Sequence, residues 1–328
     1  MSANNLHKVA IIVPVFNAEK TLKRCLDSIV HQTLDDYEVI VINDGSFDHS
    51  LKIATKYAVK YHFLKVIDQP NKGLFVTRQE GIRLANSEYI GWVDADDFVD
   101  KTMFSTLYNQ AVINDSELVY CDYYFYPRKI KTKEKWFREF KGKKDVNFVE
   151  RNSQPWNKLV KTDLLKRMNI GNLFTYCNDE AYIKVLLKAK NPISINKKLY
   201  YYSVGSDSMS TSYTNIEHYQ EFVDASYNLR DKVGCEFDDK YWQEYFNYRI
   251  IYYLLVLMIV AGNTNNKTVY NHCKSKLNSI RYTENIHLKN ILVYNFGYLK
   301  YVVISKVIPI NFYLTRVICL LAFGQNRK

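Results

Sequence analysis

Residues 9–15 read VAIIVPV, a nearly continuous apolar run typical of a parallel β-strand that is covered on both faces. Residues 37–43 (YEVIVIN) form a second run of this kind. Between the runs, after Asn17, which suits a helix N-cap, apolar side chains recur three or four positions apart. These helix-face residues are Leu22, Cys25, Leu26, Ile29 and Val30. The segment therefore predicts a strand, a helix and a second strand parallel to the first.

The same alternation continues along the chain as far as residue 124. Further strand-like runs cover 63–68, 89–93 and 118–124. Helix-like patterns between them cover 48–62, 74–86 and 101–114. Strands that alternate with helices of this length are typical of βαβ units. We therefore predict an α/β fold with a Rossmann-like, mostly parallel central sheet flanked by helices.

The pattern changes in the second half of the chain. Residues 126–144 are basic and aromatic without a clear period, which favours an excursion over one face of the sheet. Helical patterns cover 154–167 and 179–189, and residues 199–202 (LYYY) predict a short strand.

The domain organisation follows from these patterns. No strand–helix alternation continues beyond about residue 215, where the sequence is helical and basic. We predict a catalytic α/β domain over 1–214 and a helical C-terminal region over 215–328.

Composition narrows the class of protein. The 328 residues include 45 Lys and Arg against 34 Asp and Glu, a net charge of +11, and 15% are aromatic. Such a charge favours an acidic partner: nucleic acid, anionic lipid or the phosphates of a nucleotide. The six cysteines are scattered without a CxxC pair, and the seven histidines form no pair at metal-ligand spacing, which argues against a zinc ribbon or a disulfide framework. No glycine-rich phosphate loop occurs, which disfavours a dehydrogenase or a P-loop ATPase.

Polar side chains follow four of the predicted strand ends. Residues 92–97 read WVDADD, Asp44 follows the second strand, Asn17 follows the first, and Lys72 and Arg78 lie on the next connection. Because ligands of open parallel sheets bind beyond the carboxyl ends of the strands, we expect these side chains at one site. Crowded carboxylates favour Mg²⁺ or Mn²⁺, which commonly share coordination with substrate phosphates. Taken alone, each of these segments is equally an ordinary turn or helix cap.

Several segments together resemble the family 2 glycosyltransferases of the GT-A fold. They are VAIIVPVFNAEKTLKRCLDSIVHQT, YEVIVINDGSFDHS, NKGLFVTRQEGIRLANSEYIGWVDADD and PWNKLVKTDLL, and the resemblance covers residues 9–212. It is strongest for bacterial enzymes that build capsule, exopolysaccharide or other surface glycans. The resemblance implies a nucleotide-sugar donor, commonly UDP-linked, a divalent metal and inversion at the anomeric carbon.

The resemblance also implies roles for individual residues. Asp44 would bind the uracil ring, Asp94 the ribose side of the nucleotide, and Asp96 the metal (Mn²⁺ or Mg²⁺), with Asp97 a weaker metal ligand. The other residues implied to contact the nucleotide-sugar are Pro14, Val15, Asn17, Lys72, Arg78 and Ala95.

The general base is implied to lie at the start of the helix near residue 179. The family usually has a Glu-Asp pair there, but residues 176–180 read YCNDE, so Asn178 replaces the Glu and Glu180 follows the Asp. The resemblance therefore favours Asp179 as the base, with Glu180 as the alternative. Acidic residues are also favourable at any helix N-terminus, and that interpretation stays open.

A second departure concerns the residue after LYYY, where relatives often carry a cation and this chain has Ser203. Lys158 or the basic segment 126–144 would then supply a cation near the diphosphate. We also expect Trp156 and Lys158 to contact the acceptor.

The tail contains two segments relevant to membranes. Residues 250–261 (IIYYLLVLMIVA) are uncharged, but they are fewer than the ~20 that a spanning helix needs. Residues 298–324 mix apolar, aromatic and basic side chains, as does a helix that lies in the headgroup plane. Ordinary packing is the alternative for both. With no signal-peptide-like N-terminus, we expect a cytoplasmic protein, peripheral at the inner face of a bacterial cell membrane.

Two other functions remain as alternatives. A nucleotidyltransferase also uses a parallel sheet and metal-binding carboxylates, but it would release pyrophosphate from a free nucleoside triphosphate. A basic protein that binds nucleic acid or an anionic surface would explain the charge, although no recognisable nucleic-acid-binding motif occurs.

Overall fold

The computed structural model describes residues 6–127, 149, 153–168, 178–204, 215–237, 239–280, 285, 287, 303, 307–309 and 311–315, with the backbone alone for 178–181. The chain divides into two compact units, residues 1–206 and 207–328. Each unit is described by itself.

The first unit contains an eight-stranded sheet in the order β3-β2-β1-β4-β7-β6-β8-β5. One half is parallel, as expected: β1 (His7–Val15) pairs with β2 (Tyr37–Asp44) and β4 (Ser87–Trp92), and β2 pairs with β3 (Leu64–Gln69). The carboxyl ends of β1, β2 and β4 therefore lie at one edge of the sheet.

The other half of the sheet is mixed. It consists of β5 (Phe98–Val99), β6 (Leu118–Tyr126), β7 (Lys158–Lys161) and β8 (Ile193–Ser203). Strand β7 is antiparallel to both β4 and β6, and β5 is antiparallel to β8, whereas β6 and β8 run parallel. Since β5 follows the WVDADD segment directly, its pairing with β8 brings the end of β8 to the predicted metal site.

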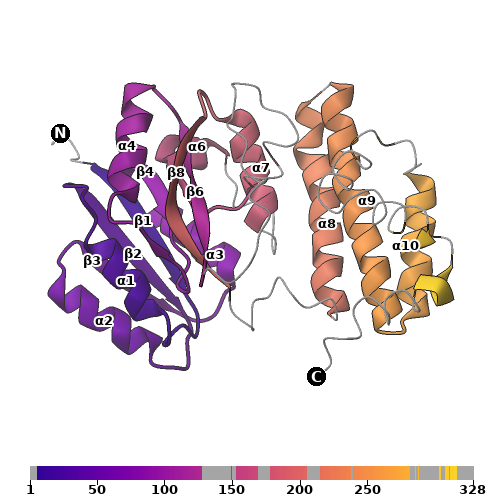
Figure 1. Cartoon of the computed structure of the whole chain (residues 1–328), viewed down its shortest axis with the longest axis horizontal. Helices are drawn as coiled ribbons and strands as arrows, with labels where there is room; N and C mark the ends of the chain where they lie inside the picture. The colour runs from indigo at the N-terminus through magenta and orange to yellow at the C-terminus, as the bar shows by residue number, and fades with distance from the viewer. Residues whose placement is uncertain are drawn as a thin grey trace. The chain divides into compact units, whose positions relative to one another are not determined.

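Helices cover both faces of this sheet (Figure 1). On one side lie α1 (Leu22–Val30), α2 (Ser50–Lys60) and α4 (Met103–Ile113). On the other lie α3 (Leu74–Leu84), α6 (Thr162–Met168) and α7 (Asn178–Lys188). The five residues expected on the apolar face of the first helix are the buried residues of α1, which confirms that prediction.

Two local predictions are wrong. The helix expected over 154–167 is instead β7 followed by α6, because residues 158–161 complete the sheet between β4 and β6. Asn17 does not cap α1, which begins at Leu22 after Thr21. It has a positive φ of 49° and joins two loops, as described below.

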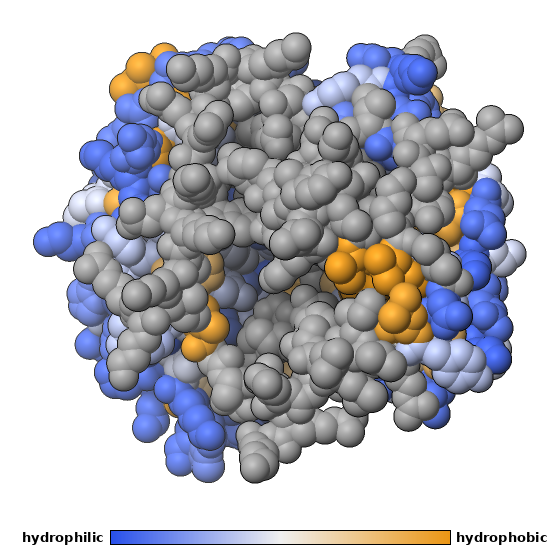
Figure 2. All heavy atoms as spheres, turned by 45° about the vertical axis from the view of Figure 1, so that its right-hand side comes forward, coloured by the Kyte–Doolittle hydropathy of each residue, from blue (hydrophilic) through white to orange (hydrophobic). Residues whose placement is uncertain are grey.

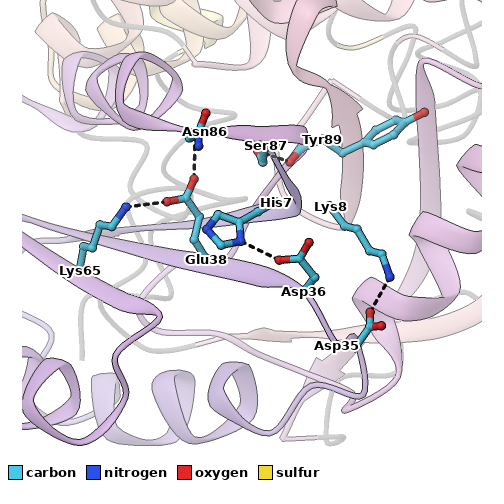
Figure 3. A network of polar contacts seen from close by, with 9 residues as sticks. All are labelled: His7, Lys8, Asp35, Asp36, Glu38, Lys65, Asn86, Ser87 and Tyr89. Atoms are coloured by element: carbon cyan, nitrogen blue, oxygen red, sulfur yellow. Dashed lines mark hydrogen bonds and ion pairs between the residues drawn. The ribbon is translucent and has the colours of Figure 1, made fainter. Parts of the chain in front are cut away.

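The amino edge of the parallel strands carries a network of paired charges (Figure 3). Glu38 in β2 is 1% exposed. Its carboxylate accepts hydrogen bonds from the Lys65 ammonium (3.1 Å) and from the Asn86 backbone N–H (2.7 Å). Two further pairs of side chains lie there, each with 2.7 Å between N and O: His7–Asp36 and Lys8–Asp35. This edge joins β1, β2, β3 and β4 through satisfied polar groups.

The described part of the second unit is helical, as predicted for the tail. It contains α8 (Ile216–Lys232), the short 3₁₀ helix η4 (Gly234–Glu236), α9 (Lys240–Asn263) and α10 (Lys267–Ser279). Helix α9 packs against α8 and α10 and includes the apolar run 250–261.

Among the described residues, α9 is long and apolar enough to cross a membrane by length and composition alone, but 83% of its most apolar stretch is buried inside the structure. The described residues on the face shown in Figure 2 are mostly hydrophilic, with apolar side chains in a few patches. The expected interfacial helix over 298–324 and most of the basic segment 126–144 lie outside the described residues.

Candidate active site

The loops that follow β1 and β2 are joined through Asn17. Its backbone N–H donates to Ser46 Oγ (3.0 Å), and its Oδ1 accepts the Phe47 backbone N–H (3.1 Å). Pro14 and Val15, at the end of β1, lie in register with the last residues of β2. The predicted nucleoside-binding residues from the first two strands are therefore neighbours.

Asp44 ends β2 and binds the loop that follows β3. Its carboxylate accepts the backbone N–H groups of Lys72 and Gly73 (both 2.9 Å) and the Gln69 side-chain amide (2.8 Å). A carboxylate has about four acceptor positions, so one remains for a ligand. Asp44 is only 3% exposed, whereas the Lys72 side chain is exposed.

Gly45 explains how these two loops approach so closely. Its φ is +71°, and a Cβ atom there would lie 2.6 Å from the Asn71 backbone nitrogen. Any side chain at this position would separate Asp44 from the backbone N–H groups of Lys72 and Gly73, from which it accepts hydrogen bonds.

Asp94 and Arg78 form an ion pair at the end of β4. The Arg78 Nη2 atom lies 2.5 Å from Asp94 Oδ1, and Arg78, from α3, is 6% exposed. The second oxygen of Asp94 has no hydrogen-bond partner within the described residues. Backbone N–H of Asp94 donates to the Tyr200 hydroxyl of β8 (3.2 Å). The arrangement fixes Asp94 while leaving one oxygen for a ligand.

Asp96 and Asp97 occupy contrasting positions in the same turn. Asp97 is fully buried, with Oδ1 accepting the Ser203 N–H (2.7 Å) and Oδ2 accepting the Tyr200 hydroxyl (2.6 Å). Asp96 is exposed, and its carboxylate has no partner from another residue in the part of the chain that is described. The exposure of Asp96 and the occupied oxygens of Asp97 therefore favour Asp96 over Asp97 as a metal ligand.

The carboxyl groups of this turn raise one another's pKa. Burial, then the charges of Asp94 and Asp96, raise the pKa of Asp97 to about 8, although its two hydrogen bonds lower it. Partial desolvation of the carboxyl group by the surrounding protein, then the charge of Asp94, raise the pKa of Asp96 above its usual value. A cation beside Asp96 would relieve this repulsion.

A divalent cation fits these residues only if the substrate supplies further ligands. The described residues contain no group of three or more His, Cys, Asp or Glu side chains arranged for a metal. Asp96 offers hard oxygen ligands, the type that Mg²⁺ and Mn²⁺ prefer together with substrate phosphates.

Two exposed aromatic residues at this edge were not identified from the sequence. Phe16 is 49% exposed and Phe47 is 86% exposed, and their ring centroids lie 6.0 Å apart at 85°. Their neighbours in the chain are Asn17 and Ser46, which join the two loops. The available signal was an aromatic residue in each loop after a predicted strand.

Helix α7 carries the base candidates, and its Tyr182 lies near the Arg78–Asp94 pair. It begins at Asn178, so Asp179 and Glu180 occupy its first turn. Tyr182 is 3% exposed and contacts Trp92 of β4 edge-to-face, with centroids 5.4 Å apart. Burial raises the pKa of Tyr182, and the charges of Arg78 and Asp94 also act on it, which shows that they are near.

A family model, glycosyl transferase family 2, matches residues 10–183 of the chain, which is more than half of its length. The chain belongs to this glycosyltransferase family. A curated relative, the cholesterol galactosyltransferase of Borreliella burgdorferi, is 31% identical over 296 residues, covering 84% of this chain and 82% of the relative.

Solved glycosyltransferase structures share the fold of this enzyme. S. aureus TarS 1–349, in complex with UDP-GlcNAc, matches with a TM-score of 0.68 at 17% identity, covering 95% of this chain and 91% of TarS. The mannosyltransferase PcManGT of Pyrobaculum calidifontis, in complex with GDP-Man and Mn²⁺, matches with a TM-score of 0.56 at 14% identity over 96% of this chain and 87% of that one. These likenesses confirm the predicted GT-A fold.

The two residues of the glycosyltransferase that were expected to contact an acceptor differ in exposure. Trp156 is half-buried, with its ring nearly parallel to Tyr200 (4.8 Å) and Tyr202 (5.1 Å). Lys158 is fully buried in β7, where its ammonium donates to Asn157 Oδ1 (2.8 Å). Because Lys158 has no exposed surface, the structure does not support the expected contact with the acceptor or the diphosphate.

Proposed function

We propose that this glycosyltransferase transfers a sugar from a nucleotide-sugar, UDP-linked, to a hydroxyl group of a lipid-linked surface-glycan acceptor, with a divalent metal and with inversion. The observation that carries the proposal is the exposed carboxylate of Asp96 beside the Arg78–Asp94 pair, at the edge where β1, β2 and β4 end; no other residue of the described part of the chain pairs with it. An acidic group in that position suits a metal-bound diphosphate.

The nucleoside would lie over the ends of β1 and β2. Asp44 keeps one acceptor position for an N–H of the base, and Pro14, Val15 and Asn17 form the adjacent wall. The exposed pair Phe16 and Phe47 adds apolar surface for a flat ring. Lys72, exposed on the neighbouring loop, supplies a positive charge for phosphate.

The diphosphate would lie over the turn after β4. Asp94 would bind the ribose with its second oxygen, and Ala95 would line the same turn. A metal bound by Asp96, with Asp97 a weaker candidate, would neutralise the charge that develops on the departing nucleoside diphosphate. The Mn²⁺ bound by the related mannosyltransferase supports this assignment.

Asp179 is the proposed general base. In a helix, residue 179 is one turn from Tyr182 and shares its side of α7, whereas residue 180 lies nearly opposite. Because Tyr182 faces β4 near Arg78 and Asp94, this spacing favours Asp179 over Glu180. Asp179 would take the proton of the acceptor hydroxyl while the oxygen of that hydroxyl bonds to the anomeric carbon. The bond from that carbon to the phosphate oxygen then breaks, and its electron pair leaves with the nucleoside diphosphate.

The acceptor is proposed to be lipid-anchored, with the enzyme bound at the inner face of a bacterial cell membrane through residues 215–328. Trp156 remains the proposed acceptor contact. A membrane lipid hydroxyl, such as that of a sterol, is a second candidate acceptor, because the relative that matches 84% of this chain is a cholesterol galactosyltransferase.

A transfer assay tests the proposal. The full chain is incubated with UDP-, GDP- and dTDP-sugars, Mn²⁺, and either a bacterial lipid-linked glycan extract or vesicles that contain cholesterol. We expect UDP release together with a glycosylated product in one acceptor arm, and loss of both in Asp179→Asn. A second incubation contains UTP and a sugar phosphate. Release of pyrophosphate there, without any transfer from UDP-sugars in the first incubation, would instead establish a nucleotidyltransferase.

A further inference from the structure

Arg24 of α1 contacts the turn that carries Asp96, although it is distant from that turn in the sequence. Its Nη2 atom donates to the Asp96 backbone carbonyl (2.8 Å) and to Ser203 Oγ at the end of β8 (2.9 Å). The next residue, Cys25, is buried, and its thiol donates to the Asp94 carbonyl (3.6 Å). Consecutive residues of α1 thus bind two carbonyl groups of one turn.

Aromatic rings hold the Arg24 guanidinium in place. Its central carbon lies 4.7 Å from the ring centroid of Phe98 and 5.0 Å from that of Tyr126. Phe98 is itself stacked on Tyr201, with centroids 4.5 Å apart and planes 5° from parallel. A planar guanidinium stacks on rings and donates in its own plane at the same time, which a lysine ammonium cannot do.

Ser203 connects Arg24 to the second side of the turn. While its hydroxyl accepts from Arg24, its backbone N–H donates to Asp97 Oδ1 (2.7 Å). Arg24 therefore holds the Asp96 carbonyl and Ser203 holds the neighbouring Asp97 carboxylate, while the Asp96 carboxylate has no partner from another residue among those described.

We propose that Arg24 is a positioning residue that fixes Asp96 in the geometry needed to bind the divalent cation of the donor complex. The inference rests on the proposed function, since it takes Asp96 as the metal ligand. Arg24 contacts neither the metal nor the sugar. It acts through the Asp96 carbonyl and through Ser203.

Isothermal titration calorimetry with UDP and Mn²⁺ tests this role. Arg24→Gln removes the charge and three of the five N–H donors, and we expect its apparent Mn²⁺ affinity to fall about 10- to 100-fold, the usual effect of losing a residue that orients a metal ligand. Arg24→Lys keeps the charge and most of the side-chain length, and should lose less affinity. UDP binding in EDTA should stay within about twofold of wild type in both variants, because the nucleoside contacts are untouched.

Lys23 provides the matched control. It is the neighbouring residue of α1, is exposed, and pairs only with Asp27 of the same helix among the described residues (2.7 Å). Lys23→Gln should bind UDP and Mn²⁺ as wild type does, which separates the position of Arg24 from a general loss of positive charge.

The outcomes distinguish the two proposals. If wild type shows no Mn²⁺-dependent UDP binding, the proposed function fails irrespective of Arg24. If wild type binds and folded Arg24→Gln and Arg24→Lys, checked by thermal unfolding in EDTA, bind Mn²⁺ as tightly as wild type, the role of Arg24 is refuted. Should Arg24→Gln not fold, Arg24→Lys decides alone, and unchanged Mn²⁺ affinity in it refutes the role.

Discussion

The two ends of the parallel strands use acidic residues in opposite ways. At the amino edge, Glu38 is buried and accepts hydrogen bonds from Lys65 and Asn86, and its neighbours Asp35 and Asp36 are paired as well (Figure 3). At the carboxyl edge, Asp94, Asp96 and Asp97 crowd into one turn. The pKa of both Asp96 and Asp97 is raised there, partly by the charge of their neighbours. Acids with complete partners stabilise the fold, whereas an acid such as Asp96, crowded by other carboxyl groups and without a partner from another described residue, indicates a ligand site.

The largest effect is expected at the start of α7. Asp179→Asn keeps the size of the side chain but removes the proton acceptor, and should lower kcat about 10²- to 10⁴-fold. Glu180→Gln, one residue further, is the matched control and should retain near-normal kcat. The assay measures initial rates of UDP release with saturating acceptor. A variant of Glu180 that loses more activity than the variant of Asp179 would move the base to Glu180.

At the amino edge we expect a change in stability without a change in activity. Glu38→Ala leaves the Asn86 N–H and the Lys65 ammonium without their acceptor, and should reduce the free energy of unfolding by about 1–3 kcal/mol. Denaturant titration measures this, and kcat at a temperature where the variant is folded should equal that of wild type. Lost activity in folded Glu38→Ala would show that the two edges are not independent.

At the carboxyl edge, denaturant titration should show an increase in the free energy of unfolding when an acidic charge is removed. In EDTA, Asp96→Asn removes a charge that its neighbours repel, so the unfolding free energy should rise, by less than about 1 kcal/mol because the residue is exposed. A clear loss of stability in the metal-free variant would mean that Asp96 has a structural partner, contrary to the comparison.

The smallest effect is expected for the exposed pair at the amino edge. Lys8→Gln breaks the contact with Asp35, but Asp35 is 76% exposed and Lys8 is 34% exposed, and ion pairs open to solvent contribute little. Thermal unfolding and kcat should both match wild type within error. A fall in Tm comparable to that of Glu38→Ala would show that burial is not what distinguishes these pairs.

Most of the α/β fold could be predicted from the period of apolar residues. The face of α1 and the strands β1 to β4 follow from runs and spacings that have one structural interpretation. Residues 158–168 do not, because a four-residue strand followed by a short helix has the same apolar spacing as a longer helix. Only pairing with β4 and β6, which lie far away in the sequence, makes Lys158–Lys161 a strand.

The candidate site was predictable in its residues but not in their contacts. The strand ends identified Asp44, Asp94 and Asp96, since parallel strands bring their carboxyl ends together. The family resemblance ranked Asp96 above Asp97 as a metal ligand, but the pattern of residues does not show that Asp97 is buried, because its burial depends on the hydrogen bonds of Tyr200 and Ser203. The burial of Lys158 and the reach of Arg24 are likewise properties of the folded sheet.

The central claim is that Asp96 makes nucleotide binding depend on a metal. Its most direct test is calorimetry of UDP binding by wild type and Asp96→Asn, each with Mn²⁺ and with EDTA. The account predicts that Mn²⁺ strengthens UDP binding by wild type, and that Asp96→Asn binds UDP with the weaker, EDTA-like affinity in both conditions. Equal strengthening by Mn²⁺ in the folded Asp96→Asn variant, or no effect of Mn²⁺ on wild type, would contradict it.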